Sequence, residues 1–414
     1  MTQEIHGTVA DGFEAVREEF TAFVAGERAD YEGQLCAYVH GRRVVDLWAG
    51  TGADALFGVF SSTKGAAYLV VALLVQDGTL ELDRKVTYYW PEFAAEGKGA
   101  LTLRDLLAHR AGVVGTDTGF TLGELADDRQ LAERLADQRP FWRPGTAFGY
   151  HALVAGALAG EVVRRATGRT LQDVYQERIR TPYGLDFHLG LPAPEEPRFR
   201  TTQPMAPTPE QQAVLDATPT GPHSLASIAF NRNAAEPTDL GSLPNMPLIR
   251  AKGPASVGGV ASARGLAGMY AAAISEVGEQ PALLKPDTVA EFGQFHSAGY
   301  DLVARAHKSF GLGFQMTADT VHPFLGAGTI GHSGAGGSQA FADPWSGLAY
   351  GYTRRRFAFP GGAAILVRCS RRACTCRSPR RLCTSSARRC CARSGCGCRR
   401  SLACRPVCTR YNRC

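Results

Sequence analysis

No stretch of this 414-residue sequence approaches the ~20 apolar residues that a membrane-spanning helix needs. Residues 1–11 also lack the basic and apolar regions of a secretory signal, so we expect a cytoplasmic protein. Residues 1–353 contain a single cysteine, Cys36, and show no metal-ligand spacing, which argues against a metal site. No glycine-rich stretch has the strand-and-helix context of a nucleotide-binding loop, so we expect no cofactor.

Acidic residues and lysines are absent from residues 354–414, which contain 17 arginines and eleven of the twelve cysteines. Residues 1–353 carry 28 Lys+Arg and 39 Asp+Glu, a net charge of −11, whereas the whole chain is +6. The overall charge is thus an average of an acidic body and a very basic tail. It should not be used to infer an acidic partner, and we expect neither a nucleic-acid nor a membrane partner.

The tail, residues 361–414, has several interpretations. Its arginines would suit a nucleic-acid arm, but its cysteine pairs lack the C-x₂-C spacing of common zinc sites, and eleven cysteines cannot all pair. Residues 1–353 use 22 Arg against 6 Lys, as a GC-rich gene would, and reading such a gene out of frame yields Arg, Cys, Ser, Pro and Ala. We favour the hypothesis that residues 361–414 are frameshifted or disordered.

The remaining residues, 1–360, have strand-like patterns at both ends and helical patterns between them. Strand runs are predicted at 34–39, 43–48, 310–316, 327–332, 338–343 and 347–353, and helices at 11–27, 66–76, 122–138, 152–167 and 262–273. This order predicts an α/β (α+β) fold with one antiparallel sheet built from both chain ends and flanked by helices. The sheet lobe would span about 1–80 and 300–360, with an all-helical lobe inserted at about 81–299.

The strongest catalytic motif is the S-x-x-K element of Ser61 and Lys64, at the predicted start of a long apolar helix. Residues i and i+3 share one helix face, so Lys64 can reach the Ser61 hydroxyl. The free N–H groups of a helix start favour negative charge on an acyl oxygen. A buried lysine there can be neutral and act as a base. The alternative is that Ser61 only caps the helix and Lys64 is solvated.

A second element is Tyr150, at the junction between the turn-rich residues 144–149 and a predicted helix. A tyrosine beside a cationic lysine can have a lowered phenol pKa and carry protons. The alternative is a packing aromatic, which is the commoner role of a lone tyrosine.

A third element is the sequence Gly331–Ser338, where a predicted strand runs into a glycine-rich turn. Glycines let the backbone approach a ligand closely, and an exposed N–H here can pair with that of Ser61 as an oxyanion hole. The alternative is an ordinary hairpin turn of small residues.

In this order and spacing the three elements resemble the signature of the serine β-lactamase and penicillin-binding-protein superfamily, S-x-x-K, Y-x-N or Y-x-S, and K-T-G or H-x-G. The similarity covers about residues 10–360 and is closest to the class C-like branch, specifically the family VIII carboxylesterases. The stretches Leu101–Gly112 and Phe310–Phe314 also look like that family. The resemblance implies an acylated nucleophile, Ser61, and a base network of Lys64 and Tyr150. It further implies a substrate-binding triplet, His332-Ser333-Gly334, and an oxyanion-hole N–H on Ala335.

Two departures from the family pattern bear on the substrate. The second motif reads Tyr150-His151-Ala152, so the side chain that binds a substrate amide in lactamases is absent. The third begins with His332 in place of lysine, which weakens recognition of a carboxylate. We therefore expect a small-molecule substrate, a short-chain or aromatic carboxylic ester. The alternatives are a β-lactamase, or a D-amino-acid peptidase or acyltransferase, on the same site, and a non-catalytic binding protein. The sequence specifies no oligomeric state.

A Ser-His-Asp hydrolase is the nearest rival chemistry, with Ser333 as nucleophile and His109 or His151 as base. The chain lacks a G-x-S-x-G elbow and the strand–helix alternation of an α/β-hydrolase. His109 is instead predicted to be a helix C-terminal residue that favours the helix dipole. Cys36 alternates within a strand pattern and is predicted to be a buried small hydrophobe.

Overall fold

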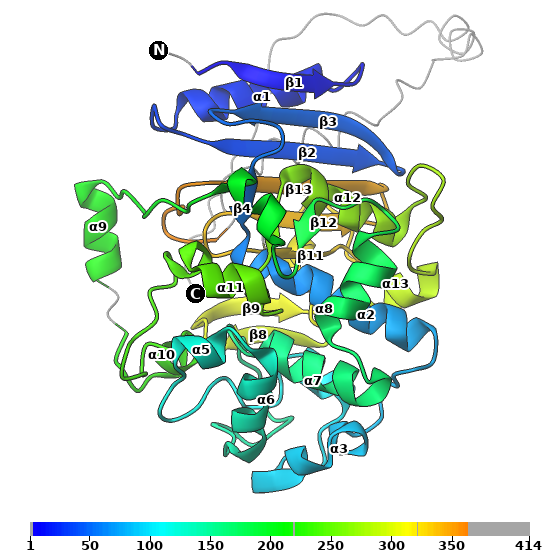
Figure 1. The fold of residues 1–414 in the computed structure, drawn as a ribbon, viewed down its shortest axis with the longest axis vertical. Helices are drawn as coiled ribbons and strands as arrows, with labels where there is room; N and C mark the ends of the chain where they lie inside the picture. Colours follow the sequence, from blue (N-terminus) through cyan, green and yellow to red (C-terminus); the bar gives the residue numbers. More distant parts are fainter. Residues whose placement is uncertain (1–2, 218–219, 321, 363–414) are drawn as a thin grey trace, which may run out of the picture. The chain divides into compact units, whose positions relative to one another are not determined.

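The computed structural model describes residues 3–217, 220–320 and 322–362. Within these residues the largest element is a nine-stranded sheet of order β1-β3-β2-β13-β12-β11-β10-β9-β8, with antiparallel neighbours (Figure 1). Its strands are β1 (Ile5–Val9), β2 (Gly33–Val39), β3 (Arg42–Ala49), β8 (Ser297–Asp301), β9 (Ala306–Phe310), β10 (Gln315–Met316), β11 (Ile330–Ser333), β12 (Gln339–Asp343) and β13 (Leu348–Arg354).

The two chain ends meet where β2 pairs with β13, with Cys36 opposite Gly351. Strands β2 and β3 form a hairpin whose turn residues His40 and Gly41 both have positive φ, as a type I′ turn requires. Cys36 is fully buried, as predicted. The predicted antiparallel sheet built from both chain ends is therefore confirmed.

Three long helices pack against this sheet. Helix α12 (Ala263–Ile274) lies so close to β13 that a Cβ on Gly351 would come within 2.5 Å of the Ala263 carbonyl oxygen. Helix α2 (Thr63–Gln76) is buried along most of its length and meets α12 where Gly65 contacts Tyr270. Helix α1 (Glu14–Ala25) packs against β1 and β3. The start of α2 and the turn before it, which together carry the S-x-x-K element, are thereby fixed within the core.

The inserted segment is mainly helical (Figure 1). Besides α12, its α-helices are α3 (Val86–Tyr89), α4 (Leu103–Leu107), α5 (Leu122–Leu125), α6 (Asp128–Asp137), α7 (Ala155–Thr167), α8 (Leu171–Tyr175), α9 (Pro209–Asp216), α10 (Leu225–Ala229), α11 (Pro247–Lys252) and α13 (Pro286–Phe292). A further α-helix, α14 (Thr317–Thr320), follows β10. Short 3₁₀ turns are η1 (Phe60–Ser62), η2 (Pro91–Gly97), η4 (Ala193–Arg198) and η5 (Leu243–Asn245), and η3 (Gln176–Arg180) is a π turn.

The structure corrects three expected elements. The helix predicted at 122–138 is two helices, because the Asp127 side chain caps a new start at α6. The strand predicted at 310–316 is divided between β9 and β10. The inserted segment is not all helical, because β5 (Phe187–His188), β6 (Phe199–Arg200) and β7 (Val260–Ala261) form a small sheet with β4 (Leu56–Gly58). Strands of two residues are too short to leave a periodic pattern.

All described residues belong to a single compact unit. The predicted lobe boundaries remain a prediction, and α12 lies on the sheet although it falls within residues 81–299. Among the described helices, none combines the length and the apolar character that crossing a bilayer requires. The tail predicted to be frameshifted or disordered lies outside the described residues, apart from Gly361 and Gly362.

Candidate active site

The candidate nucleophile, Ser61, lies in the short turn between β4 and α2. The residue before it, Phe60, adopts a left-handed backbone with φ of 48°, a conformation that costs energy and that proteins retain mainly at functional sites. Its ring is held by Phe357, at a centroid distance of 5.4 Å, and by the close backbone of Gly336. The N-cap position of α2 is Ser62 and not Ser61, and Ser61 is partly exposed, so the interpretation of Ser61 as only a helix cap is not supported.

The candidate base, Lys64, is fully buried on the first turn of α2. Its Nζ lies 3.3 Å from Ser61 Oγ, 2.6 Å from the Ala152 carbonyl oxygen and 2.8 Å from the Ser256 carbonyl oxygen. Among the described residues no carboxylate forms an ion pair with it. Burial therefore lowers the pKa of Lys64 well below its usual value. The interpretation of Lys64 as a solvated lysine is wrong.

The two carbonyls determine where the lysine lone pair points. A neutral amine has two N–H bonds, and the Ala152 and Ser256 carbonyls can accept both. The nitrogen lone pair is then left for the third neighbour, the Ser61 hydroxyl. This arrangement suits proton transfer from serine to lysine without any further ionisable group.

Tyr150 lies on the other side of the amine, with Lys64 Nζ 5.0 Å from its ring centroid. Burial raises the pKa of Tyr150 well above its usual value, and the nearby Ser61 hydroxyl opposes this rise only partly. The Tyr150 hydroxyl is buried and meets no hydrogen-bond partner of normal geometry among the described residues. The expected lowering of the phenol pKa is therefore wrong, because burial of the hydroxyl outweighs the interactions that would lower it.

Three buried histidines surround Tyr150. The His109 and His332 ring centroids lie 5.4 and 5.9 Å from that of Tyr150, and His151 stacks on His109 at 5.3 Å. Burial lowers the pKa of His151 to about 4 and of His332 to about 3, and it lowers the pKa of His109 well below its usual value. These rings are thus uncharged at neutral pH, and the polar groups of the site carry little net charge.

The prediction that His109 is a helix C-terminal residue that favours the helix dipole is wrong. His109 follows α4 with a positive φ of 60° and turns into the site, where its Nδ1 accepts the His151 backbone N–H at 3.3 Å. It is therefore a buried neutral ring and not a cation on a helix end.

The third motif is bonded directly to the nucleophile turn. Ser62 Oγ donates to the His332 carbonyl oxygen at 3.2 Å and lies 3.0 Å from Ser338 Oγ. Ser338 Oγ in turn donates to the Val59 carbonyl oxygen at 2.7 Å. These bonds hold the turn between β11 and β12, which contains Gly334 and Ala335, beside Ser61. The Ala335 N–H donates to no other residue in the described ranges, so it is free to bind a substrate oxygen.

The rival nucleophile, Ser333, contacts no basic side chain through its hydroxyl among the residues that the structure describes. Its hydroxyl donates to Gln315 Oε1 at 2.9 Å, and its backbone N–H donates to the same oxygen at 3.0 Å. The His332 ring points Nδ1 at the Ser333 carbonyl and not at its hydroxyl. The geometry therefore favours Ser61 over Ser333.

Sequence reasoning missed three residues of the site: Ser256, Gln315 and Asp301. Ser256 acts through its main-chain carbonyl, for which no sequence motif exists. Asp301 Oδ1 accepts the backbone N–H groups of Tyr150, Val303 and Ala304, and so fixes the Tyr150 loop. Gln315 and Asp301 lie at strand ends, where polar residues are common and carry no specific signal.

Comparisons with known proteins agree with this geometry. A model of the family described as Beta-lactamase matches residues 20–365. The esterase/beta-lactamase LipL of Mycobacterium tuberculosis is 31% identical over 376 residues, which cover 86% of this chain and 84% of LipL. The structure of EstA from Arthrobacter nitroguajacolicus is 40% identical with a TM-score of 0.82, covering 91% of this chain and 98% of EstA. That of a family VIII carboxylesterase is 31% identical with a TM-score of 0.79, covering 90% and 100% of the two chains.

Proposed function

Because this chain belongs to the Beta-lactamase family and is a serine hydrolase of the esterase/beta-lactamase type, we propose that it is a carboxylesterase acting through an acyl-enzyme on Ser61. The observation that carries the proposal is the buried Lys64 amine, 3.3 Å from the Ser61 hydroxyl. A lysine whose pKa is lowered by burial can take the serine proton at neutral pH.

In the acylation step, the Ser61 proton moves to Lys64 while Ser61 Oγ forms a bond to the ester carbonyl carbon. The carbonyl oxygen becomes an oxyanion, for which the N–H groups of Ser61 and Ala335 are the proposed donors. The alkoxide then leaves and takes a proton from the Tyr150 hydroxyl, which regains one from the Lys64 ammonium. Water repeats the sequence on the acyl-enzyme and releases the acid.

We further propose that the preferred substrates are neutral, short-chain or aromatic esters. His332 occupies the position of the family's lysine, but its pKa is lowered to about 3 by burial, so it offers no positive charge to a substrate carboxylate at pH 7. Ala152 has no side-chain amide for a substrate amide, and its carbonyl is already bonded to Lys64. Both facts disfavour a penicillin or a peptide.

A panel of p-nitrophenyl esters, nitrocefin and a D-alanyl p-nitroanilide tests the proposal on wild type and Ser61→Ala. Hydrolysis of acetyl and butyryl esters that is lost in Ser61→Ala supports it. Efficient hydrolysis of nitrocefin or of the amide, with negligible ester turnover, would favour the second candidate, a β-lactamase or D-amino-acid peptidase or acyltransferase. That candidate draws on the double description of LipL as an esterase/beta-lactamase. A cytoplasmic location is likewise proposed, and cell fractionation tests it.

A further inference from the structure

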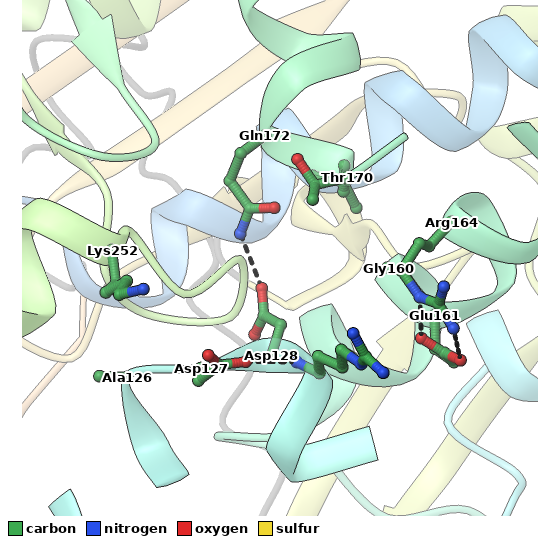
Figure 2. Close-up of a pocket in the computed structure, with 11 residues that line it drawn as sticks. Ala126, Asp127, Asp128, Gly160, Glu161, Arg164, Thr170, Gln172 and Lys252 are labelled. Carbon is green, nitrogen blue, oxygen red and sulfur yellow. Dashed lines mark hydrogen bonds and ion pairs between the residues drawn. The ribbon is translucent and has the colours of Figure 1, made fainter. Parts of the chain in front are cut away.

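A small pocket of about 220 Å³ is lined by residues of α6, α7 and α8 and by Lys252 of α11. Figure 2 shows its lining, in which Asp128 and Gln172 point toward one another. Gln172 Nε2 donates to Asp128 Oδ2 at 2.8 Å and lies 3.2 Å from the Gly253 carbonyl oxygen. The same Asp128 oxygen accepts the Ala255 backbone N–H at 2.9 Å. Asp128 and Gln172 thus bind the chain at Gly253 and Ala255.

The residue after Ala255 is Ser256, whose carbonyl accepts a hydrogen bond from Lys64. The segment Gly253–Ser256 is also held from α7, where the Gly156 N–H donates to Ser256 Oγ at 2.7 Å. The contact with α7 is tight, because a Cβ on Gly156 would lie 2.3 Å from the Ala255 carbonyl carbon. The Ser256 carbonyl therefore has little freedom once both anchors are in place.

We propose that Asp128 is a positioning residue, which holds Gly253–Ser256 so that the Ser256 carbonyl takes one N–H of Lys64 and leaves the amine lone pair facing Ser61. The proposal rests on the function proposed for Ser61 and Lys64. Asp128 itself touches neither residue and acts only through the main chain of Ala255 and Ser256. Its other oxygen, Oδ1, has no hydrogen-bond partner among the described residues.

Two substitutions of Asp128 can distinguish the effect of its charge from the effect of its hydrogen bonds. Burial raises its pKa to about 6, and the neighbouring Asp127 adds to this rise, whereas the Ala255 and Gln172 bonds oppose it. Arg129, Glu161, Arg164 and Lys252 also line the cavity. In Asp128→Asn the amide oxygen can keep both bonds, with the amide nitrogen at the unpartnered Oδ1 position. Asp128→Ala removes both bonds.

The test is the second-order rate of labelling by a fluorophosphonate, measured from pH 5 to 10, which needs no knowledge of the natural ester. We expect Asp128→Ala to lose at least tenfold in the plateau rate. We also expect the acid limb of the pH–rate profile of Asp128→Ala to move to lower pH. The Ser256 carbonyl favours the charged form of the Lys64 amine, so loss of this acceptor lowers the pKa of Lys64 further. Asp128→Asn should label like wild type. The labelling rate of Gln172→Ala should lie between the rates of Asp128→Ala and Asp128→Asn. This variant replaces Asp128→Ala in the test if Asp128→Ala does not fold.

The matched control is Asp127→Ala, which removes the α6 cap bonds to the Arg129 and Gln130 N–H groups but none to Ala255. It should lower Tm and leave the labelling rate and its pH limb unchanged. An Asp128→Ala rate equal to wild type, an unchanged or upward-shifted limb, or an equal loss in Asp127→Ala would overturn the proposal. So would an Asp128→Asn variant that behaves like Asp128→Ala. If wild-type labelling does not depend on Ser61, the proposed function itself has failed.

Discussion

The Lys64 amine nitrogen lies 3.3 Å from the Ser61 hydroxyl oxygen, and the lysine side chain has no exposed surface. Two main-chain carbonyls hold the amine, and within the described residues no acidic side chain is paired with it. Isolated from carboxylates and from bulk water, the lysine is destabilised as a cation. In the proposed function, this environment is what lets Lys64 act as the base.

Replacing this base should abolish most of the activity. Lys64→Ala is expected to lower kcat for p-nitrophenyl butyrate by about 10²- to 10⁴-fold, the range for loss of a positioned proton acceptor. KM should change far less, because the amine contacts the nucleophile and not the ester. Lys285→Ala, at an exposed position, is the control and should keep wild-type kcat. A Lys64→Ala enzyme with kcat within threefold of wild type would show that another group takes the serine proton.

Removing the Tyr150 hydroxyl should separate catalysis from stability. The hydroxyl is buried and meets no hydrogen-bond partner of normal geometry among the described residues, so Tyr150→Phe should leave Tm unchanged or raise it. Its kcat should nevertheless fall by about 10²-fold or more, since the leaving alkoxide loses its proton donor. Thermal melts and kcat on one ester measure both. A fall in Tm with unchanged kcat would make Tyr150 only a packing residue.

The buried histidines predict a loss of stability in mild acid. The folded-state pKa values of His151 and His332, about 4 and about 3, lie below the usual value near 6.5. As pH falls below 6.5 the unfolded chain binds protons first, so stability decreases down to the folded-state values. Each ring contributes a slope of up to about 1.4 kcal/mol per pH unit.

Urea unfolding at pH 7, 6 and 5 measures this slope. A His332→Gln variant should have a shallower slope than wild type between pH 6 and pH 5. Equal slopes in the two proteins would mean that His332 is protonated in the folded state.

The fold was predictable where local chemistry decides it. The S-x-x-K element was placed correctly because i and i+3 residues meet on any helix. The β2–β3 hairpin was predicted because two strand-like runs flank a short turn at Gly41. Strands β1 and β8 were not predicted, since each is largely exposed on alternate residues at a sheet edge. The direction of the Tyr150 pKa shift depends on burial and was not readable from neighbouring residue types.

The site was less predictable where main-chain atoms or backbone conformation act. His109 looked like a helix-end residue, but a left-handed φ turns its ring inward, and no residue pattern announces that conformation. The carbonyl of Ser256 lies in a stretch for which the sequence predicts no helix or strand. The sequence thus indicates the reacting side chains, whereas their orientation comes from contacts between distant segments.

The tail leads to a prediction about the gene. The family match ends at residue 365, just before Cys369, the first of the eleven cysteines of the tail. We expect resequencing of the 3′ end in independent clones to restore an ordinary mixture of acidic and basic residues after Gly361–Ile365. Identical Arg- and Cys-rich sequence in every clone would exclude the frameshift.

The most direct measurement of the central claim is the identity of the acylated residue. Incubation with a fluorophosphonate, followed by peptide mass mapping, should place one adduct on Ser61. Ser61→Ala should carry none, while Ser333→Ala should label like wild type. An adduct on Ser333, or one that persists in Ser61→Ala, would contradict the assignment of the nucleophile.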